Sequence, residues 1–232
     1  MVIGVLHRRD FILRAGAAAA AGLFGVPAGA RQAAAAAIHA PAAKPARAPV
    51  ILVLGDSLSA EYGLPRGSGW VALLEKKLAQ EKIPASVVNA SVSGETTSGG
   101  RARLPALLTQ HRPSVVVIEL GGNDALRGLA LQHTEENLVA MVQAAQQAGA
   151  KVLLVGMQVP PNYGAAYTQR FAALFPKVAR AHKAALVPFL LAGVADGPDP
   201  TAMFQPDRIH PNAQAQPRLL ANVWPQLVKL LR

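Results

Sequence analysis

The side chains in this sequence that are best suited to chemistry are one serine and an aspartate–histidine pair. Ser57 lies in Gly-Asp-Ser-Leu-Ser at residues 55–59, and Asp207 precedes His210 in Asp-Arg-Ile-His-Pro-Asn. A serine hydroxyl is a poor nucleophile at neutral pH and needs a neighbouring base. A histidine can be that base when an acceptor holds its tautomer. A spacing of three residues lets a carboxylate meet an imidazole in one turn. The pattern therefore predicts Ser57 as nucleophile, His210 as general base and Asp207 as the residue that orients His210.

Acyl transfer also needs hydrogen-bond donors aimed at the oxyanion of the tetrahedral intermediate. The backbone N–H of Ser57 can serve if this serine lies in a sharp turn between a strand and a helix. Gly94, in Ser-Val-Ser-Gly-Glu at residues 91–95, can bring a second N–H close because it has no side chain in the way. Asn123, in Gly-Gly-Asn-Asp, supplies a side-chain NH₂ group. We predict an oxyanion hole formed by these three residues.

Strands and helices alternate along the chain in the order needed to bring these residues together. Apolar runs typical of covered parallel strands alternate with segments of helical period. The predicted strands are residues 50–54, 86–89, 115–120, 151–157 and 185–189; the predicted helices are residues 69–81, 99–111, 134–148, 165–182 and 213–231. This alternation predicts a three-layer α/β/α, flavodoxin-like fold with a five-stranded parallel sheet of order 2-1-3-4-5. Pro188 lacks a backbone donor, which places the fifth strand at an edge. Ligands in such sheets bind at the carboxyl ends of the strands.

The four motifs, in this order, resemble the signature blocks of the SGNH (GDSL) hydrolase superfamily. The resemblance runs from about residue 50 to the C-terminus. It is closer still to a periplasmic bacterial branch that combines thioesterase, arylesterase and lysophospholipase activity, through Glu-Leu-Gly-Gly-Asn-Asp at 119–124 and Pro-Asn-Tyr-Gly at 161–164. It implies the same roles for Ser57, His210 and Asp207, and the same oxyanion donors. Arg208 departs from the pattern, at a position that is often small or polar in the family.

The acyl group of a substrate should lie in an apolar channel beside the serine. The loop at residues 125–131 and the segment at 157–167 are the candidate walls. Their apolar side chains, which we predict to bind substrate, are Leu126, Leu129, Met157, Val159 and Tyr163. Asp56 and Asp124 flank catalytic positions and are expected to hold their loops through backbone N–H groups.

The sequence suggests neither a metal nor an organic cofactor. It has no cysteine, and the other histidines, among them His111, His133 and His182, have no second ligand at metal spacing and are interpreted as surface residues. A phosphate site would need a glycine-rich loop and a lysine before a helix, and no segment has that form. The predicted reaction needs only water.

The first fifty residues have the composition of a targeting signal and linker rather than of a folded element. Arg8-Arg9-Asp10-Phe11-Ile12 precedes a weakly apolar run that ends in Ala-Gly-Ala at residues 28–30. We interpret residues 1–30 as an export signal of the twin-arginine type and residues 31–49 as an Ala/Pro-rich linker. The hydrolase domain is then residues 50–232. An ordinary Sec signal, and cleavage after residues 35–37, remain alternatives. Export predicts a periplasmic or secreted protein whose partners include the twin-arginine machinery.

The formal charge of +10 bears on partners. The cations are scattered and aromatic residues are few, which argues against nucleic acid and favours a generally basic surface that anionic lipid can approach. The predicted substrates are small-molecule acyl esters: lysophospholipid, fatty acyl or aryl esters, and thioesters as a further class. Carbohydrate O-acetyl ester hydrolysis is the alternative reaction. A non-catalytic ligand-binding module is the alternative of another class, although no catalytic residue is missing.

Overall fold

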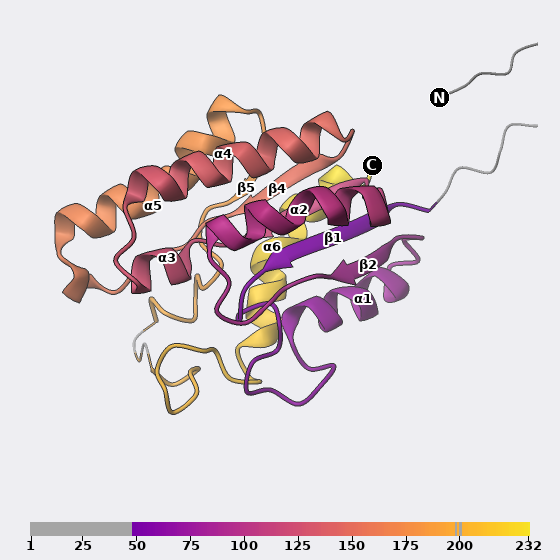
Figure 1. The fold of residues 1–232 in the computed structure, drawn as a ribbon. Helices are drawn as coiled ribbons and strands as arrows, with labels where there is room; N and C mark the ends of the chain where they lie inside the picture. Colours follow the sequence, from indigo (N-terminus) through magenta and orange to yellow (C-terminus); the bar gives the residue numbers. More distant parts are fainter. Residues whose placement is uncertain (1–47, 198, 200) are drawn as a thin grey trace, which may run out of the picture. The chain divides into compact units, whose positions relative to one another are not determined.

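The computed structural model describes residues 48–197, 199 and 201–232 (Figure 1). The predicted export signal, and all of the predicted linker except its last two residues, lie outside these ranges. Within them, no helix combines the length and the apolar character needed to cross a bilayer.

A parallel sheet of five strands forms the middle layer, in the order β2-β1-β3-β4-β5. Its strands are β1 (Val50–Gly55), β2 (Ser86–Asn89), β3 (Val115–Glu119), β4 (Lys151–Val155) and β5 (Ala185–Val187). Every residue of β1 and β3 is buried, which explains why their sequences are almost continuously apolar. The predicted sheet and strand order are confirmed.

Helices cover both faces of this sheet (Figure 1). Helices α1 (Trp70–Gln80) and α6 (Gln216–Leu230) pack together on one face, and α2 (Thr97–His111), α4 (Leu131–Gln147) and α5 (Ala165–Ala181) cover the other. Large side chains fill the space between the layers. Trp70 is fully buried on α1, and Phe171 meets Phe175 edge-on along α5 with ring centroids 5.5 Å apart. This is the predicted three-layer α/β/α arrangement.

Several element boundaries differ from the sequence prediction. The short helix α3 (Gly122–Leu126) and the 3₁₀ turn η1 (Pro161–Tyr163) were not predicted, because elements this short carry no readable period. Helix α4 begins three residues earlier than predicted and α6 three residues later. The α6 delay has a local cause, since the side chain of Asn212 accepts the N–H groups of residues 214 and 215 in a turn of its own. Strand β5 lies at the sheet edge, as predicted, and ends one residue before Pro188.

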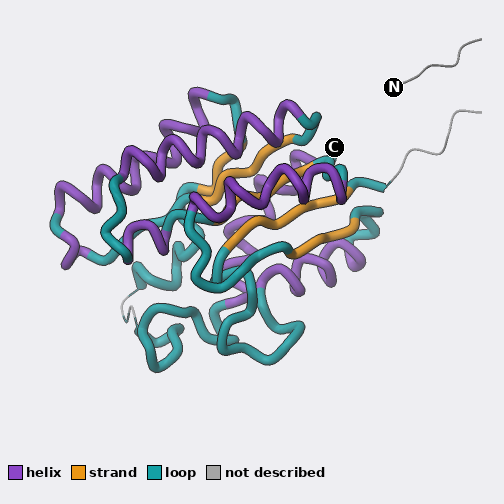
Figure 2. The backbone as a smooth tube through the Cα atoms, in the orientation of Figure 1, coloured by secondary structure: helices purple, strands orange, loops and turns teal. Residues whose placement is uncertain are grey.

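Long loops gather beyond the carboxyl ends of the strands (Figure 2). Strands β1 and β3 are neighbours, with Gly55 opposite Glu119, so the segments that follow them leave the sheet side by side. Strand β2 flanks β1 on its other side. The sheet order therefore brings the loops that carry Ser57, Gly94 and Asn123 to one place.

Candidate active site

Ser57 and His210 lie 153 residues apart in the chain but are hydrogen-bonded in the fold. Ser57 is in the turn that follows β1, and its Oγ lies 2.9 Å from Nε2 of His210. On the other side of the imidazole, Nδ1 lies 2.6 Å from Oδ2 of Asp207. The structure thus places the three side chains predicted to form the triad in one unbroken chain of contacts.

The backbone around Asp207 holds its carboxylate against the imidazole. Oδ1 accepts the N–H groups of Ile209, at 2.9 Å, and His210, at 3.0 Å. Partial burial acts to raise the pKa of Asp207, but these backbone donors and the imidazole together lower it to about 2. Arg208, the departure from the family pattern, has φ of 58°, a left-handed conformation that costs a non-glycine residue about 1–2 kcal/mol. This conformation turns the chain so that the N–H groups of Ile209 and His210 can reach the Asp207 carboxylate.

Asn123 lies between the other two predicted oxyanion donors. Its Nδ2 donates to Oδ2 of Asp56, beside the nucleophile, and to the backbone carbonyl of Glu95, beside Gly94, both at 3.0 Å. Gly94 has φ of 79°, which explains why a glycine occupies this position. Arg127 donates to the Gly94 carbonyl at 2.7 Å and ties the loop after β3 to the loop after β2. The three predicted donors are therefore brought to one place, although both hydrogens of the Asn123 amide have protein acceptors here.

Two buried carboxyl groups lie beneath the nucleophile turn. Asp56 is 2% exposed and Glu119 is fully buried. Burial raises the pKa of Asp56 to about 6, although Leu58 N–H, His210 and Asn123 act to lower it. Burial, and then the neighbouring Asp56, raise the pKa of Glu119 well above its usual value. The sequence analysis assigned no separate role to Glu119. The feature that could have identified it is a carboxylate at the end of an otherwise apolar strand.

The loop-holding role predicted for the two aspartates is confirmed. Asp56 accepts the N–H of Leu58 at 3.0 Å, which closes the nucleophile turn. Asp124 accepts both the N–H, at 2.9 Å, and the hydroxyl of Thr97, which joins α3 to the start of α2.

Tyr62 is a site residue that sequence reasoning missed. Its ring centroid lies 4.4 Å from that of His210, and half of its surface is exposed. It comes from the turn that carries Ser57, and nothing in its spacing distinguishes it from other loop residues. The ring therefore packs against one side of the imidazole.

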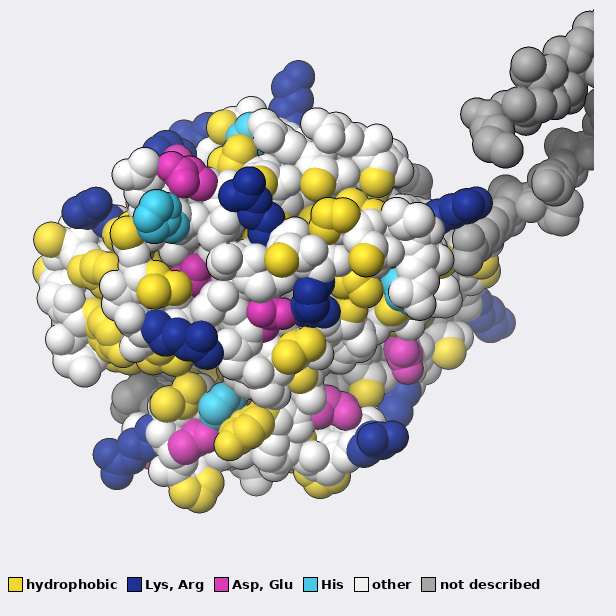
Figure 3. All heavy atoms as spheres, in the orientation of Figure 1, with side chains coloured by type: hydrophobic (Ala, Val, Ile, Leu, Met, Phe, Trp, Pro, Cys, Tyr) yellow, Lys and Arg dark blue, Asp and Glu magenta, His cyan; other side chains and the backbone are white. Residues whose placement is uncertain are grey.

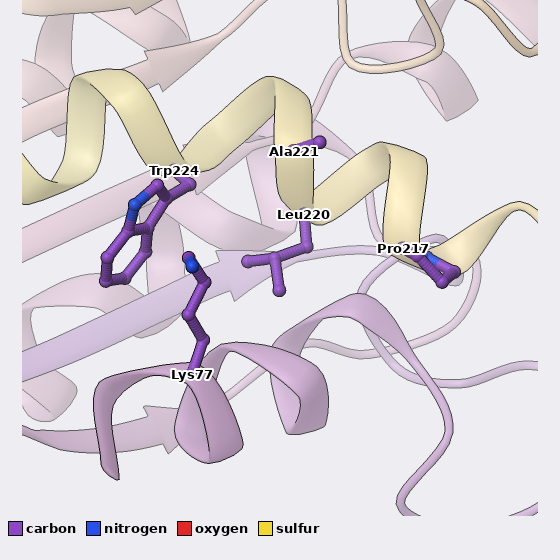
Figure 4. A pocket seen from close by; sticks show the side chains of 5 residues that line it. All are labelled: Lys77, Pro217, Leu220, Ala221 and Trp224. Atoms are coloured by element: carbon purple, nitrogen blue, oxygen red, sulfur yellow. The ribbon is translucent and has the colours of Figure 1, made fainter. Parts of the chain in front are cut away.

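The five predicted substrate contacts divide into two groups. Leu126, Leu129 and Tyr163 are exposed, whereas Met157 and Val159 are buried and show little surface to a ligand. None of the five lines a depression of 340 Å³ between α1 and α6 (Figure 4), whose walls are Lys77, Pro217, Leu220, Ala221 and Trp224. Nor do they line a second one, of 320 Å³, between α4 and α5. That these five residues contact the substrate therefore stays a prediction.

Basic side chains show no dominant patch on the face drawn in Figure 3. There, Lys and Arg stand apart from one another, and hydrophobic side chains lie beside a histidine. His133 is exposed, whereas His111 and His182 are half-buried. On this face the basic side chains are therefore dispersed.

Comparisons with known proteins show the family to which this chain belongs. The model of the GDSL-like lipase/acylhydrolase family matches residues 53–217. Esterase TesA of Pseudomonas aeruginosa is 55% identical over 186 residues, covering 80% of this chain and 91% of that protein. Thioesterase 1/protease 1/lysophospholipase L1 of Escherichia coli is 46% identical over 172 residues, covering 74% and 80%. The chain belongs to the GDSL-like lipase/acylhydrolase family.

Solved structures extend the agreement to the fold. The crystal structure of TesA superposes with a TM-score of 0.75 at 55% identity, covering 78% of this chain and 99% of that one. The psychrotrophic esterase EstA from Pseudoalteromonas sp., solved with monoethylphosphonate as inhibitor, gives 0.73 at 41% identity, covering 78% and 98%. The predicted SGNH-hydrolase fold is confirmed, and the protein is a hydrolase of this family.

Proposed function

We propose that this protein hydrolyses carboxylic esters through a covalent acyl-enzyme formed on Ser57. The observation that carries the proposal is the continuous contact from Ser57 Oγ through the imidazole of His210 to Asp207. Family membership and two esterase relatives support the reaction class. Covalent labelling of Ser57 by a serine-directed phosphonate tests it directly.

In the first half-reaction, Ser57 Oγ bonds to the acyl carbon while its proton passes to His210 Nε2. The bond to the leaving group then breaks, and His210 returns the proton to the departing oxygen. Water next attacks the acyl carbon while His210 Nε2 takes one of its protons. The bond from the acyl carbon to Ser57 Oγ then breaks, and His210 returns that proton to Oγ. Asp207, which stays ionised with a pKa of about 2, stabilises the imidazolium formed in each half-reaction.

The substrate classes that fit best are lysophospholipids, fatty acyl esters and aryl esters. Among the relatives, one is named a thioesterase and lysophospholipase and another an arylesterase. An exported enzyme would seldom meet acyl-CoA, so oxygen esters are the primary proposal and thioesters a secondary one. Three exposed apolar side chains in the segments that follow β3 and β4, Leu126, Leu129 and Tyr163, favour acyl groups longer than acetyl.

Turnover of aryl esters is expected to rise as the acyl chain lengthens from acetate to medium length. Each methylene buried against these segments contributes about 0.8 kcal/mol of binding, so kcat/KM should increase by up to about fourfold per added carbon until the apolar surface is covered. The measurement is a p-nitrophenyl ester series with purified protein. A strict preference for acetate would instead favour the carbohydrate O-acetyl esterase alternative.

Contact with a lipid surface is a further part of the proposal. The exposed large hydrophobic side chains in the described part of the chain all come from loops or short helical turns that follow the strands: Tyr62, Val92, Leu126, Leu129, Tyr163 and Ile209. Arg66, Arg127 and Arg208 are exposed on the same loops. Apolar side chains with flanking cations suit the surface of an aggregated anionic lipid. A lysophospholipid arm of the ester series, run below and above micelle formation, tests this contact through a rise in turnover on aggregation.

We also propose export by the twin-arginine route, on the sequence of residues 1–30 alone. Replacing Arg8 and Arg9 together by lysine is expected to leave the protein in the cytoplasm, because the receptor of this route distinguishes the two cations. Cell fractionation followed by an esterase assay measures the distribution. Undiminished periplasmic recovery of the Arg8→Lys/Arg9→Lys variant would favour the Sec route.

A further inference from the structure

Glu119 lies directly beneath the nucleophile turn and holds it at two points. It is the last residue of β3 and is fully buried. Its Oε2 accepts the backbone N–H of Asp56 at 3.3 Å and the hydroxyl of Ser59 at 2.7 Å. These two donors lie on either side of Ser57 in the chain, so one carboxyl oxygen joins both ends of the turn that carries the nucleophile.

A third group also contacts the Ser59 hydroxyl. The indole Nε1 of Trp70 donates to Ser59 Oγ at 3.2 Å, so the hydroxyl proton of Ser59 is free to point at Glu119. A side chain at Gly55 would lie 2.7 Å from Glu119 Oε2, which explains why a glycine precedes the nucleophile turn. The sheet, α1 and the turn therefore converge on this one carboxyl group.

The surroundings of Glu119 suit a neutral acid better than a carboxylate. None of the ion pairs in the described ranges involves it. Its Oε1 is buried without any hydrogen-bond partner, and the neighbouring acidic group is Asp56. An ionised carboxylate with one oxygen bare in the interior is far more costly than a neutral acid with one unsatisfied group.

Asp56 has the complementary surroundings. Its Oδ1 accepts Leu58 N–H and its Oδ2 accepts the Asn123 amide, at 3.0 Å each, and His210 favours its ionised form whenever the imidazole is protonated. Two adjacent carboxyl groups with environments this different take different protonation states. A neutral Glu119 removes the like charge that would oppose an ionised Asp56, and the ionised Asp56 can then hold the oxyanion amide.

We propose that Glu119 is a positioning residue which acts as a protonated carboxylic acid and fixes the turn that presents the hydroxyl and the backbone N–H of Ser57. The inference rests on the proposed Ser57 chemistry and adds to it a residue that does not touch the substrate. Because the acid works only through the position of Ser57, its loss should lower kcat and leave KM near the wild-type value.

Two substitutions separate charge from shape. Glu119→Gln keeps one acceptor oxygen and places an NH₂ group where the acid carries its proton, so kcat should stay within about threefold of wild type. Glu119→Leu fills a similar volume but accepts nothing, and kcat should fall by about 10- to 100-fold, the range expected when a nucleophile is misplaced by up to about an ångström. The exposed Glu75, changed to Gln and to Leu, is the matched control and should leave kcat unchanged.

Infrared spectroscopy gives a readout that a merely structural role would not move. At pH 8, where Asp56 is ionised, the wild-type protein should show a protonated-carboxyl band that shifts in D₂O and is missing from Glu119→Gln. The proposal is overturned if this band is absent, if Glu119→Gln loses as much kcat as Glu119→Leu, or if Glu119→Leu keeps wild-type kcat. The band and the Gln variant decide the matter even if the Leu variant does not fold.

The same assay separates this proposal from the proposed function. Wild-type turnover that does not depend on Ser57 contradicts the proposed function, whatever Glu119 does. Ser57-dependent turnover that is indifferent to Glu119→Leu contradicts the positioning role alone.

Discussion

Ser57→Ala is expected to reduce ester turnover by about 10⁶-fold, to the level left by binding and the oxyanion donors. The variant should also fail to react with a serine-directed phosphonate that labels the wild-type protein with one equivalent. The physical reason is that Ser57 Oγ is the atom hydrogen-bonded to His210 Nε2, and within the described residues this base is bonded to no other hydroxyl. The measurements are kcat on a medium-chain aryl ester and intact-protein mass after labelling.

Two further variants make the result specific. Ser98→Ala removes an exposed serine at the start of α2 and should behave as wild type. His210→Ala should lose about as much activity as Ser57→Ala, and the double variant little more, because the members of a triad act as a unit. Retention by Ser57→Ala of a few per cent of wild-type turnover would contradict the assigned nucleophile.

The sheet and the residues that meet at its edge could be predicted from the sequence because both depend on local pattern. Continuous apolar runs specify strands that helices cover on both faces, and right-handed crossovers then leave few possible strand orders. Ser57, Gly94 and Asn123 each follow a strand, so the strand order alone brings them to one edge. The contact between Asp207 and His210 follows from their spacing in one turn.

The remaining features depend on packing, which local pattern does not encode. Glu119 looked like the polar end of a strand, and only its register opposite Gly55 shows that it supports the nucleophile turn. The contact of Tyr62 with His210 depends on how two loops fold over each other. Met157 and Val159 follow β4 as the proposed wall residues should, yet they turn into the core. Helix α3 is too short to show the roughly 3.6-residue spacing of apolar residues by which a helix is recognised in a sequence.

Substitution of Asn123 is the other change expected to have a large effect on kcat, and the hydrogen bonds of its amide determine which control the experiment needs. In the oxyanion role its amide donates to an oxygen that carries full charge only in the tetrahedral intermediate. Here its two hydrogens go to Asp56 and to the Glu95 carbonyl. A developing oxyanion is a stronger acceptor than a neutral carbonyl, so we expect it to take the hydrogen now held by Glu95 while Asp56 keeps the amide oriented.

Asn123→Ala is therefore expected to lower kcat by about 10²–10³-fold, or roughly 3–4 kcal/mol of transition-state stabilisation, with KM nearly unchanged. It also leaves the buried Asp56 without one of its donors, so some loss of melting temperature is expected whatever the role of Asn123. Melting temperature alone cannot separate catalysis from structure. The deciding quantity is kcat at temperatures where the variant is fully folded.

Asn222 offers the matched control for that measurement. Its amide likewise donates both hydrogens to protein acceptors, the carbonyls of Leu190 at 2.8 Å and Ala192 at 2.9 Å, and it belongs to α6 rather than to the site. Asn222→Ala should lower the melting temperature and leave kcat unchanged. Asn123→Asp should lower kcat at least as far as Asn123→Ala, because it sets a second carboxylate against Asp56 and repels the developing oxyanion. If both Asn123 variants behaved as Asn222→Ala does, with reduced melting temperature and normal kcat in the folded range, Asn123 would hold the loop after β3 and take no part in the oxyanion hole.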